Sequence, residues 1–202
     1  MSVTDRRERQ KLALRQEILT AARELFAKEG YENVSMRRIA EKIEYSPTTI
    51  YLYFRDKDEL LHEMCTETFA LLTRKLTKLL GTAGDPVDKL RMGLKAYVQF
   101  GLKHPNHYFT TFMQPAAKCG EEHQYEGSPG ADAFQKLVEG VTACVQARRF
   151  RETDVLAISQ SLWMVTHGIT SLLISFGADF PWVERDRLID LTVENALRGW
   201  EV

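Results

Sequence analysis

Residues 35–60 read SMRRIAEKIEYSPTTIYLYFRDKDEL and carry the most informative pattern of the 202-residue chain. Ser35 stands before an apolar row from Met36 to Ile43, whose members recur at the spacing of one helical face. Serine is a favoured N-cap, because its hydroxyl accepts a hydrogen bond from a backbone N–H that the first turn leaves unpaired. The pattern predicts a short helix that begins just after Ser35.

Two further helix starts follow in the same stretch. Ser46 precedes Pro47, and proline suits the first position of a helix, where its missing N–H is not needed. Asp56 and Glu59 have the spacing of a capping box, with aspartate in place of serine or threonine. Two short helices followed by a long one predict a helix-turn-helix, the arrangement with which many proteins read DNA.

Helical periodicity continues along the rest of the chain, and no segment shows a sustained alternation of apolar and polar residues. We therefore predict an all-α fold, with a three-helix N-terminal domain over residues 1–55 and a roughly six-helix domain over residues 56–202. The polar segment 115–130 contains three glycines and two prolines and is predicted to be a loop. The other expected helices cover residues 8–29, 56–80, 85–104, 106–114, 131–150, 153–176 and 183–199.

Bulk composition limits the possible functions. The formal net charge of -1 excludes a protein that is basic overall, so affinity for nucleic acid must come from a local patch. The first 28 residues supply one, with seven basic and four acidic side chains. The three scattered cysteines form no C-x-x-C pair, which argues against a metal site and a disulfide framework. No membrane span or signal peptide is recognised, so we expect a cytoplasmic protein. No cofactor is expected, since the sequence has no Gly-rich phosphate loop.

The N-terminal part resembles the DNA-binding domain of the tetracycline repressor (TetR) family of bacterial transcriptional regulators. The resemblance rests on ILTAARELFAKEGYENVSMRRIAEKI at 18–43 and on TTIYLYFRDKDELL at 48–61. It implies a repressor that binds an inverted-repeat operator as a homodimer and is released by a small-molecule effector. One departure lies in the turn before the recognition helix, where Glu44 and Tyr45 replace the small residue, often glycine, that family members carry.

The DNA contacts are expected around the second short helix. Thr48 and Thr49 stand at its N-terminal end, where they can reach base edges, and a phenolic hydroxyl such as that of Tyr51 can reach phosphate oxygens. Lys57 is unfavourable in the first turn of its own helix, so we predict that it neutralises a phosphate. The complete predicted set is Ser35, Arg37, Ser46, Pro47, Thr48, Thr49, Tyr51, Tyr53 and Lys57.

The C-terminal part contains HPNHYFTTFM at 104–113 and WMVTHGITSLL at 163–173, which resemble a TetR subgroup with a Trp-x-x-x-His-Gly motif. An effector pocket and a dimer interface are predicted there, although aromatic residues at helical spacing also serve as ordinary core. The pocket set is Phe100, His104, Tyr108, Phe109, Phe112, Met113, Trp163 and His167. The dimer set is Leu162, Ile169, Leu172, Leu173, Phe176, Leu188, Leu191 and Asn195.

Two other classes of function stay open. Glu59 and His62 have the Glu-x-x-His spacing of helical di-iron enzymes, but that architecture needs a second copy, which the sequence does not contain. We therefore predict neither a metal site nor an enzyme. The near-neutral charge also allows a helical protein-interaction module that has lost DNA binding, and a DNA-binding assay distinguishes this possibility.

Overall fold

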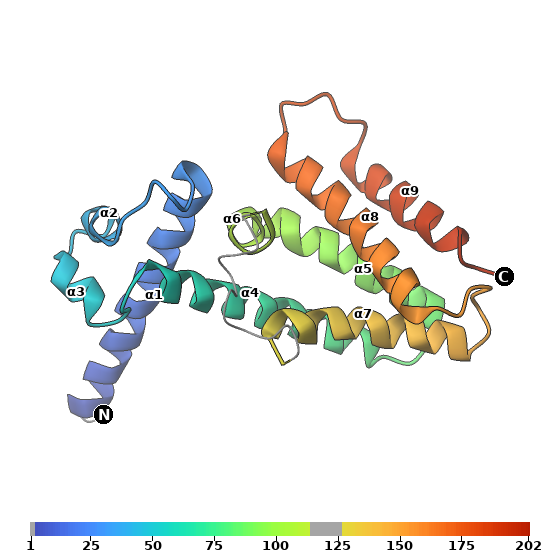
Figure 1. Cartoon of the computed structure of the whole chain (residues 1–202), viewed down its shortest axis with the longest axis horizontal. Coiled ribbons are helices and arrows are strands. Elements are labelled where there is room, and N and C mark those ends of the chain that lie inside the picture. Colours follow the sequence, from blue (N-terminus) through green and yellow to red (C-terminus); the bar gives the residue numbers. More distant parts are fainter. Residues whose placement is uncertain (1–2, 114–126) are drawn as a thin grey trace. The chain divides into compact units, whose positions relative to one another are not determined.

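The computed structural model describes residues 3–113 and 127–202, and in these residues the fold is helical, as predicted (Figure 1). The sequence-based loop 115–130 lies outside the described residues except for its last four. The helices are α1 Val3–Glu29, α2 Met36–Lys42, α3 Pro47–Tyr51, α4 Lys57–Leu80, α5 Pro86–Lys103, α6 Pro105–Tyr108, the π-helix η1 Phe109–Met113, α7 Pro129–Gln146, α8 Val155–Ser175 and α9 Arg185–Arg198.

The chain forms two compact units. Unit 1 contains the described residues of Met1–Glu67 and Asn106–Glu122, and unit 2 contains those of Thr68–Pro105 and His123–Val202. This division differs from the sequence-based boundary at residue 55, because α4 begins in unit 1 and continues without a break into unit 2. The start of a helix is visible in the sequence as a cap, whereas the packing that separates two units is not.

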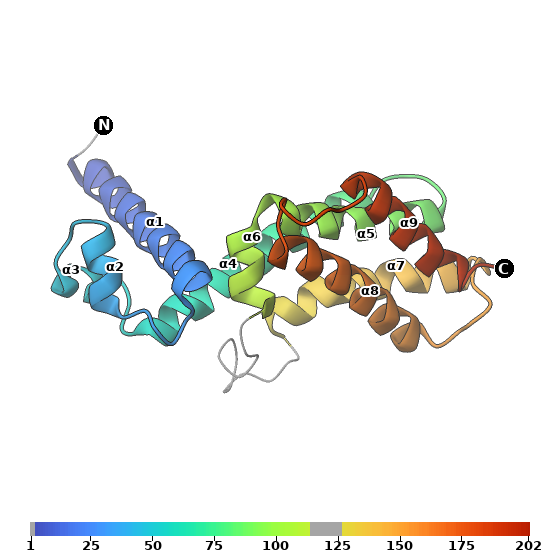
Figure 2. The ribbon, with the colours of Figure 1, turned by 90° about the horizontal axis from the view of Figure 1, so that it is seen from above.

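In unit 1, α2 packs against α1 and α3 packs against α2 (Figure 2). Its core includes Ile18 and Phe26 from α1, Ile39 from α2 and Ile50 from α3, and none of the four side chains is exposed. Of these, Ile39 belongs to the apolar row that the helical periodicity indicated. Burial of the four side chains fixes the short helices, which are too short to be stable alone.

The helix starts are capped as the sequence predicts. The side chains of Ser35 and Ser46 accept hydrogen bonds from the backbone N–H groups three residues later, and that of Asp85 caps α5 ahead of Pro86. At the start of α4, the predicted capping box of Asp56 and Glu59 is shifted by one residue. Asp56 Oδ1 accepts from Glu59 N at 2.8 Å, but the Glu59 carboxylate accepts from Arg55 N at 2.5 Å rather than from Asp56 N. Glu59 therefore has a capping function.

The turn between α2 and α3 adopts the conformation that glycine favours. Glu44 has φ of 59°, in the left-handed region where a side chain is unfavourable. The glycine that the family often carries would fit this geometry without strain, so the departure noted in the sequence has a conformational cost.

Glu44→Gly should therefore stabilise unit 1 by about 0.5–1 kcal/mol, since relief of the left-handed strain exceeds the extra backbone entropy that glycine has when unfolded. Denaturant unfolding measures the gain. Glu44→Ala is the control and should show no comparable increase, because alanine keeps the Cβ atom. An equal gain in both variants would mean that the carboxylate, and not the backbone, is the unfavourable feature.

In unit 2, α5 packs against α7, α8 and α9. Leu94 and Val98 of α5 are buried with Ile158 of α8 and Val193 of α9. A bridge between Phe150 and Glu201 holds the last residues beside the α7–α8 connection. Within the described residues, no helix has the length and apolar character needed to cross a membrane.

The segment after α5 departs from regular α-helix. Sequence periodicity indicated one aromatic helix over 106–114, whereas the structure has the short α6 and then η1, in which the backbone widens to a π-helix. Thr110 and Thr111 lie in η1, and their buried hydroxyls have no hydrogen-bond partner among the described residues. A π-helix has no side-chain periodicity that single-sequence patterns reveal.

Candidate DNA-binding site

The candidate site is the outer face of α3 with the turns that flank it. Ile50 and, shortly after the helix, Phe54 are buried and hold α3 on the core of unit 1. Thr48 and Tyr51 point away from this core and are exposed, Tyr51 by 54%. A short helix with its anchors buried and its polar face exposed is the geometry that a recognition helix needs.

The two threonines of α3 are not equivalent. Thr49 is half-buried, and its Oγ1 lies 2.9 Å from Ser46 Oγ, while its backbone N–H donates to the same serine oxygen at 3.2 Å. Thr49 is thus part of the N-cap. Thr48 is exposed, and so it offers both its hydroxyl and its methyl group to a ligand. Of the two predicted readout residues, Thr48 has the better geometry.

Lys57 has a structural contact that sequence reasoning did not anticipate. Its ammonium donates to the carbonyl of Tyr31 at 2.7 Å and lies 4.1 Å from the centre of the Tyr31 ring. Burial lowers the pKa of Lys57, although the neighbouring Asp58 acts in the opposite direction. The lysine therefore links the start of α4 to the turn after α1, which is a reason for its presence besides the predicted phosphate contact.

The remaining predicted contacts are exposed, except Tyr53, and they differ in their availability. Ser35 uses its hydroxyl as the cap of α2, while the side chain of Arg37 is 80% exposed and pairs with Glu41 one turn later at 3.1 Å. An exposed i, i+4 pair is weak, so Arg37 can exchange its partner for a phosphate at little cost. Pro47 is exposed and Tyr53 is half-buried.

Sequence reasoning missed two features of this face. Leu52 follows α3 and is 75% exposed, an unusual place for a large apolar side chain, and its methyl groups could meet a thymine methyl. The guanidinium of Arg15 in α1 lies 4.9 Å from the centre of the Phe54 ring and is 3.1 Å from Glu63 in α4. The basic count of the N-terminus gave a signal for Arg15, but not for its position beside α3.

The predicted effector residues are distributed over both units. Tyr108, Phe109, Phe112 and Met113 belong to unit 1, and Phe100, His104, Trp163 and His167 belong to unit 2. The pocket as a whole therefore stays a prediction.

Within unit 2, a small polar group surrounds His167. The Tyr97 hydroxyl is 3.4 Å from His167 Nδ1, and Ser171 Oγ is 3.3 Å from Nε2. Burial lowers the pKa of His167 and so favours its neutral form. The Trp163 ring lies 6.0 Å from the imidazole and 5.9 Å from the Phe134 ring. Tyr97 and Phe134 were not anticipated, because they come from α5 and α7 and reach α8 only through packing. Ser171 was missed although it lies one turn after His167 on the same helix, a spacing that the sequence shows.

The predicted dimer residues separate into buried and exposed sets. Leu162 and Leu173 are 1% and 2% exposed, so they belong to the core of unit 2 and cannot supply an outer interface. Leu172, Phe176 and Leu191 are about half exposed. Asn195 is also exposed, whereas Ile169 and Leu188 are intermediate. The sequence indicated the wide apolar character of α8 but not which side meets the core.

Two family models match the chain. The model of bacterial regulatory proteins of the tetR family matches residues 18–64, and the model of the tetracycline repressor-like C-terminal domain matches residues 90–196, which is more than half of the chain. The chain belongs to the TetR family. The segment that matches the first TetR model contains α2 and α3, so the candidate site described above lies where the family's regulatory-protein domain is recognised.

Curated relatives and solved structures agree with TetR membership. An uncharacterised HTH-type regulator of Haemophilus influenzae is 37% identical over 68 residues, or 34% of this chain and 36% of the relative. An HTH-type regulator of Staphylococcus aureus (strain USA300) is 44% identical over 86 residues, or 43% of this chain and 46% of the relative. The matched segments thus span less than half of these relatives.

Solved structures are similar over nearly the whole chain. The fatty acid degradation regulator FadR of Bacillus halodurans has a TM-score of 0.76 at 19% identity, covering 91% of this chain and 94% of that one. PfmR of Thermus thermophilus has a TM-score of 0.72 at 21% identity, covering 92% and 99%. At such identity the likeness shows the shared TetR fold alone.

Proposed function

We propose that this protein is a sequence-specific, DNA-binding transcriptional regulator and not an enzyme. The observation that carries the proposal is α3, a capped helix in a family-matched segment whose buried side holds Ile50 and Phe54 and whose exposed side presents Thr48 and Tyr51. Thr48 reads a base edge, while Tyr51 and the weakly paired Arg37 contact phosphates. The apolar Leu52 adds a surface for a thymine methyl group.

The regulator acts as a homodimer through α8 and α9. Met164, Gly168 and Leu172 of α8 and Phe176, the C-cap of this helix, follow one another at four-residue spacing, and the three large members are 66%, 50% and 55% exposed. A Cβ atom added at Gly168 would meet nothing within 4 Å. An exposed apolar ridge with a glycine in its middle allows a helix of a second copy to approach closely, and Leu191 of α9 extends the surface.

The protein acts in the cytoplasm as a repressor, and binding of a small molecule releases it from DNA. The group around His167 supports this part of the proposal, because Tyr97, His167 and Ser171 supply neutral hydrogen-bonding atoms next to the flat, 40%-exposed ring of Trp163. It includes the Trp-x-x-x-His-Gly motif, so the predicted subgroup is part of the proposal. Native mass spectrometry of the purified protein tests whether a small molecule is carried.

Selection of bound sequences from a random duplex pool tests the DNA-binding function directly. The expected result is an enriched palindrome whose half-sites are about 34 Å, or a multiple of this, apart. Recovery of no enriched sequence, together with binding that does not depend on salt, would instead favour the protein-interaction module.

The two threonines give a matched pair for the same selection. Thr48→Val should change the preference at one base position, with a loss of about 1–3 kcal/mol for the wild-type site, because it removes a hydroxyl at constant shape. Thr49→Val should change affinity for all sequences equally, through the loss of its bond to Ser46. A changed base preference in Thr49→Val alone would show that readout belongs to Thr49.

A further inference from the structure

We propose that the first turns of α1 form a phosphate clamp, in which Arg7 and Lys11 neutralise the DNA backbone beside the groove that α3 enters. This inference rests on the proposed function. The clamp is defined by these two residues, which lie on a helix that extends beyond its own packing. Residues 5–13 of α1 are all exposed, whereas the first buried residue of this helix is Ile18.

The charge inventory of unit 1 leads to this segment. Six of the twelve basic side chains in the described part of unit 1 have an acidic partner within 3.2 Å, and two more, Arg9 and Lys57, donate to backbone carbonyls. The pairs are Arg15–Glu63, Arg23–Glu67, Arg37–Glu41, Arg38–Glu29, Lys42–Glu24 and Arg55–Asp56. Arg6, Arg7, Lys11 and Lys28 have no ionic partner among the described residues, and three of these four lie in the first turns of α1. Positive charge free to meet phosphate is thus concentrated there.

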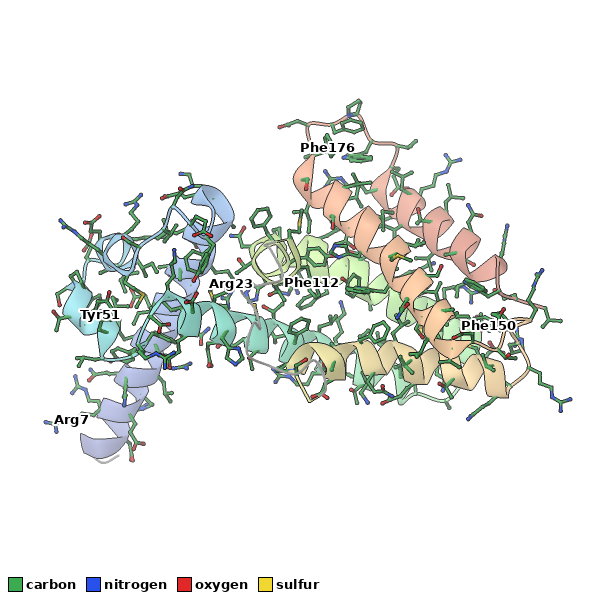
Figure 3. All side chains as sticks on the ribbon, in the orientation of Figure 1. Arg7, Arg23, Tyr51, Phe112, Phe150 and Phe176 are labelled. Carbon is green, nitrogen blue, oxygen red and sulfur yellow. The ribbon has the colours of Figure 1, made fainter. Side chains whose placement is uncertain are left out.

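Helix geometry places two of these three, Arg7 and Lys11, on the face of α1 that carries Arg15. Arg7, Lys11 and Arg15 are spaced by four residues, and each step turns the side chain by only about 40° around the helix. Arg15, the last of this row, lies against the Phe54 ring directly after α3. Arg15 also pairs with Glu63 of α4, so the row continues the face of α1 that meets α4 and the connection between α3 and α4, and it reaches about 12 Å beyond Arg15. In Figure 3, Arg7 and Tyr51 lie on the same side of α1.

The extension has no other evident source of stability. Its one large apolar side chain, Leu12, is 65% exposed, so packing does not hold these turns. A helix that is solvated on all sides is only marginally stable, but this one is propagated from the packed part of α1. Such a rigid extension presents its charges with less loss of conformational entropy than a disordered arm.

Salt dependence of operator binding tests the clamp. Arg7→Ala and Lys11→Ala should each reduce the steepness of log K, the logarithm of the binding constant, against log salt by about 0.9 for each DNA-binding unit. This is the value for one phosphate contact. The base preference should not change, because phosphate contacts carry no sequence information. Alanine keeps the helix, which circular dichroism checks.

Lys28→Ala is the matched control, since Lys28 is an exposed lysine without an ionic partner at the other end of α1. Its slope should equal that of the unaltered protein. If the protein binds a palindrome but the clamp variants keep its slope, the clamp is wrong and the proposed function stands. If no palindrome is selected but the slope still falls in these variants, the clamp stands and the specific function fails.

Discussion

Glu67→Gln should destabilise unit 1 by about 3 kcal/mol, because it leaves the charge of Arg23 buried without its counter-ion. The Arg23 side chain is 6% exposed and donates from Nη2 to Glu67 at 3.0 Å, while its Nε has no hydrogen-bond partner among the described residues. Burial lowers the pKa of Arg23, and the hydrogen bond to Glu67 partly restores it. Calorimetry or denaturant unfolding of the full chain measures the loss.

The chain contains a matched control for this prediction on the same two helices. Arg15 and Glu63 form an equivalent pair at 3.1 Å, but each side chain is 34% exposed, so Glu63→Gln should cost less than about 1 kcal/mol. A third variant separates charge burial from packing. Arg23→Met should cost less than Glu67→Gln, since the carboxylate it leaves behind is 26% exposed and can be hydrated. Equal losses in Glu67→Gln and Glu63→Gln would contradict the burial argument.

Local chemistry made much of the fold predictable. The caps at Ser35, Ser46 and Asp85 depend only on neighbours within three residues, and all three are present in the structure. The left-handed turn at Glu44 could be suspected from the sequence, because family members often carry glycine where this chain has Glu44. The π-helix η1 could not, because its wider turn depends on surroundings and not on a sequence period.

The site was less predictable because its chemistry depends on partners that are distant in sequence. Lys57 was read as a phosphate ligand from its unfavourable place in α4, yet its contact is with Tyr31, 26 residues earlier. The sequence of α8 identified its apolar positions but not their directions. Leu173 faces the core, whereas its neighbour Leu172 faces outward. Periodicity gives the relative directions of side chains on a helix, and only tertiary packing decides which direction is inward.

Leu172→Glu should convert the proposed homodimer to a monomer and lower operator affinity by about 10²–10⁴-fold. Leu172 is 50% exposed near the middle of the α8 ridge, beside the open position at Gly168. In a two-fold interface the substitution places a carboxylate from each copy in an apolar contact, where burial of an unpaired charge is strongly unfavourable. Loss of the dimer removes the second DNA-binding unit, and with it the increase in affinity that comes from linking two binding units.

Sedimentation velocity and operator titration measure the two effects in one preparation. Leu156→Glu is the control on the same helix, because Leu156 is 56% exposed but lies more than two turns before Met164, the first residue of the ridge, and about 24 Å along α8 and 160° around it from Leu172. This variant should remain dimeric and bind the operator normally. A monomeric Leu172→Glu variant that keeps full operator affinity would mean that one DNA-binding unit is sufficient. A dimer in both variants would place the interface away from the α8 ridge.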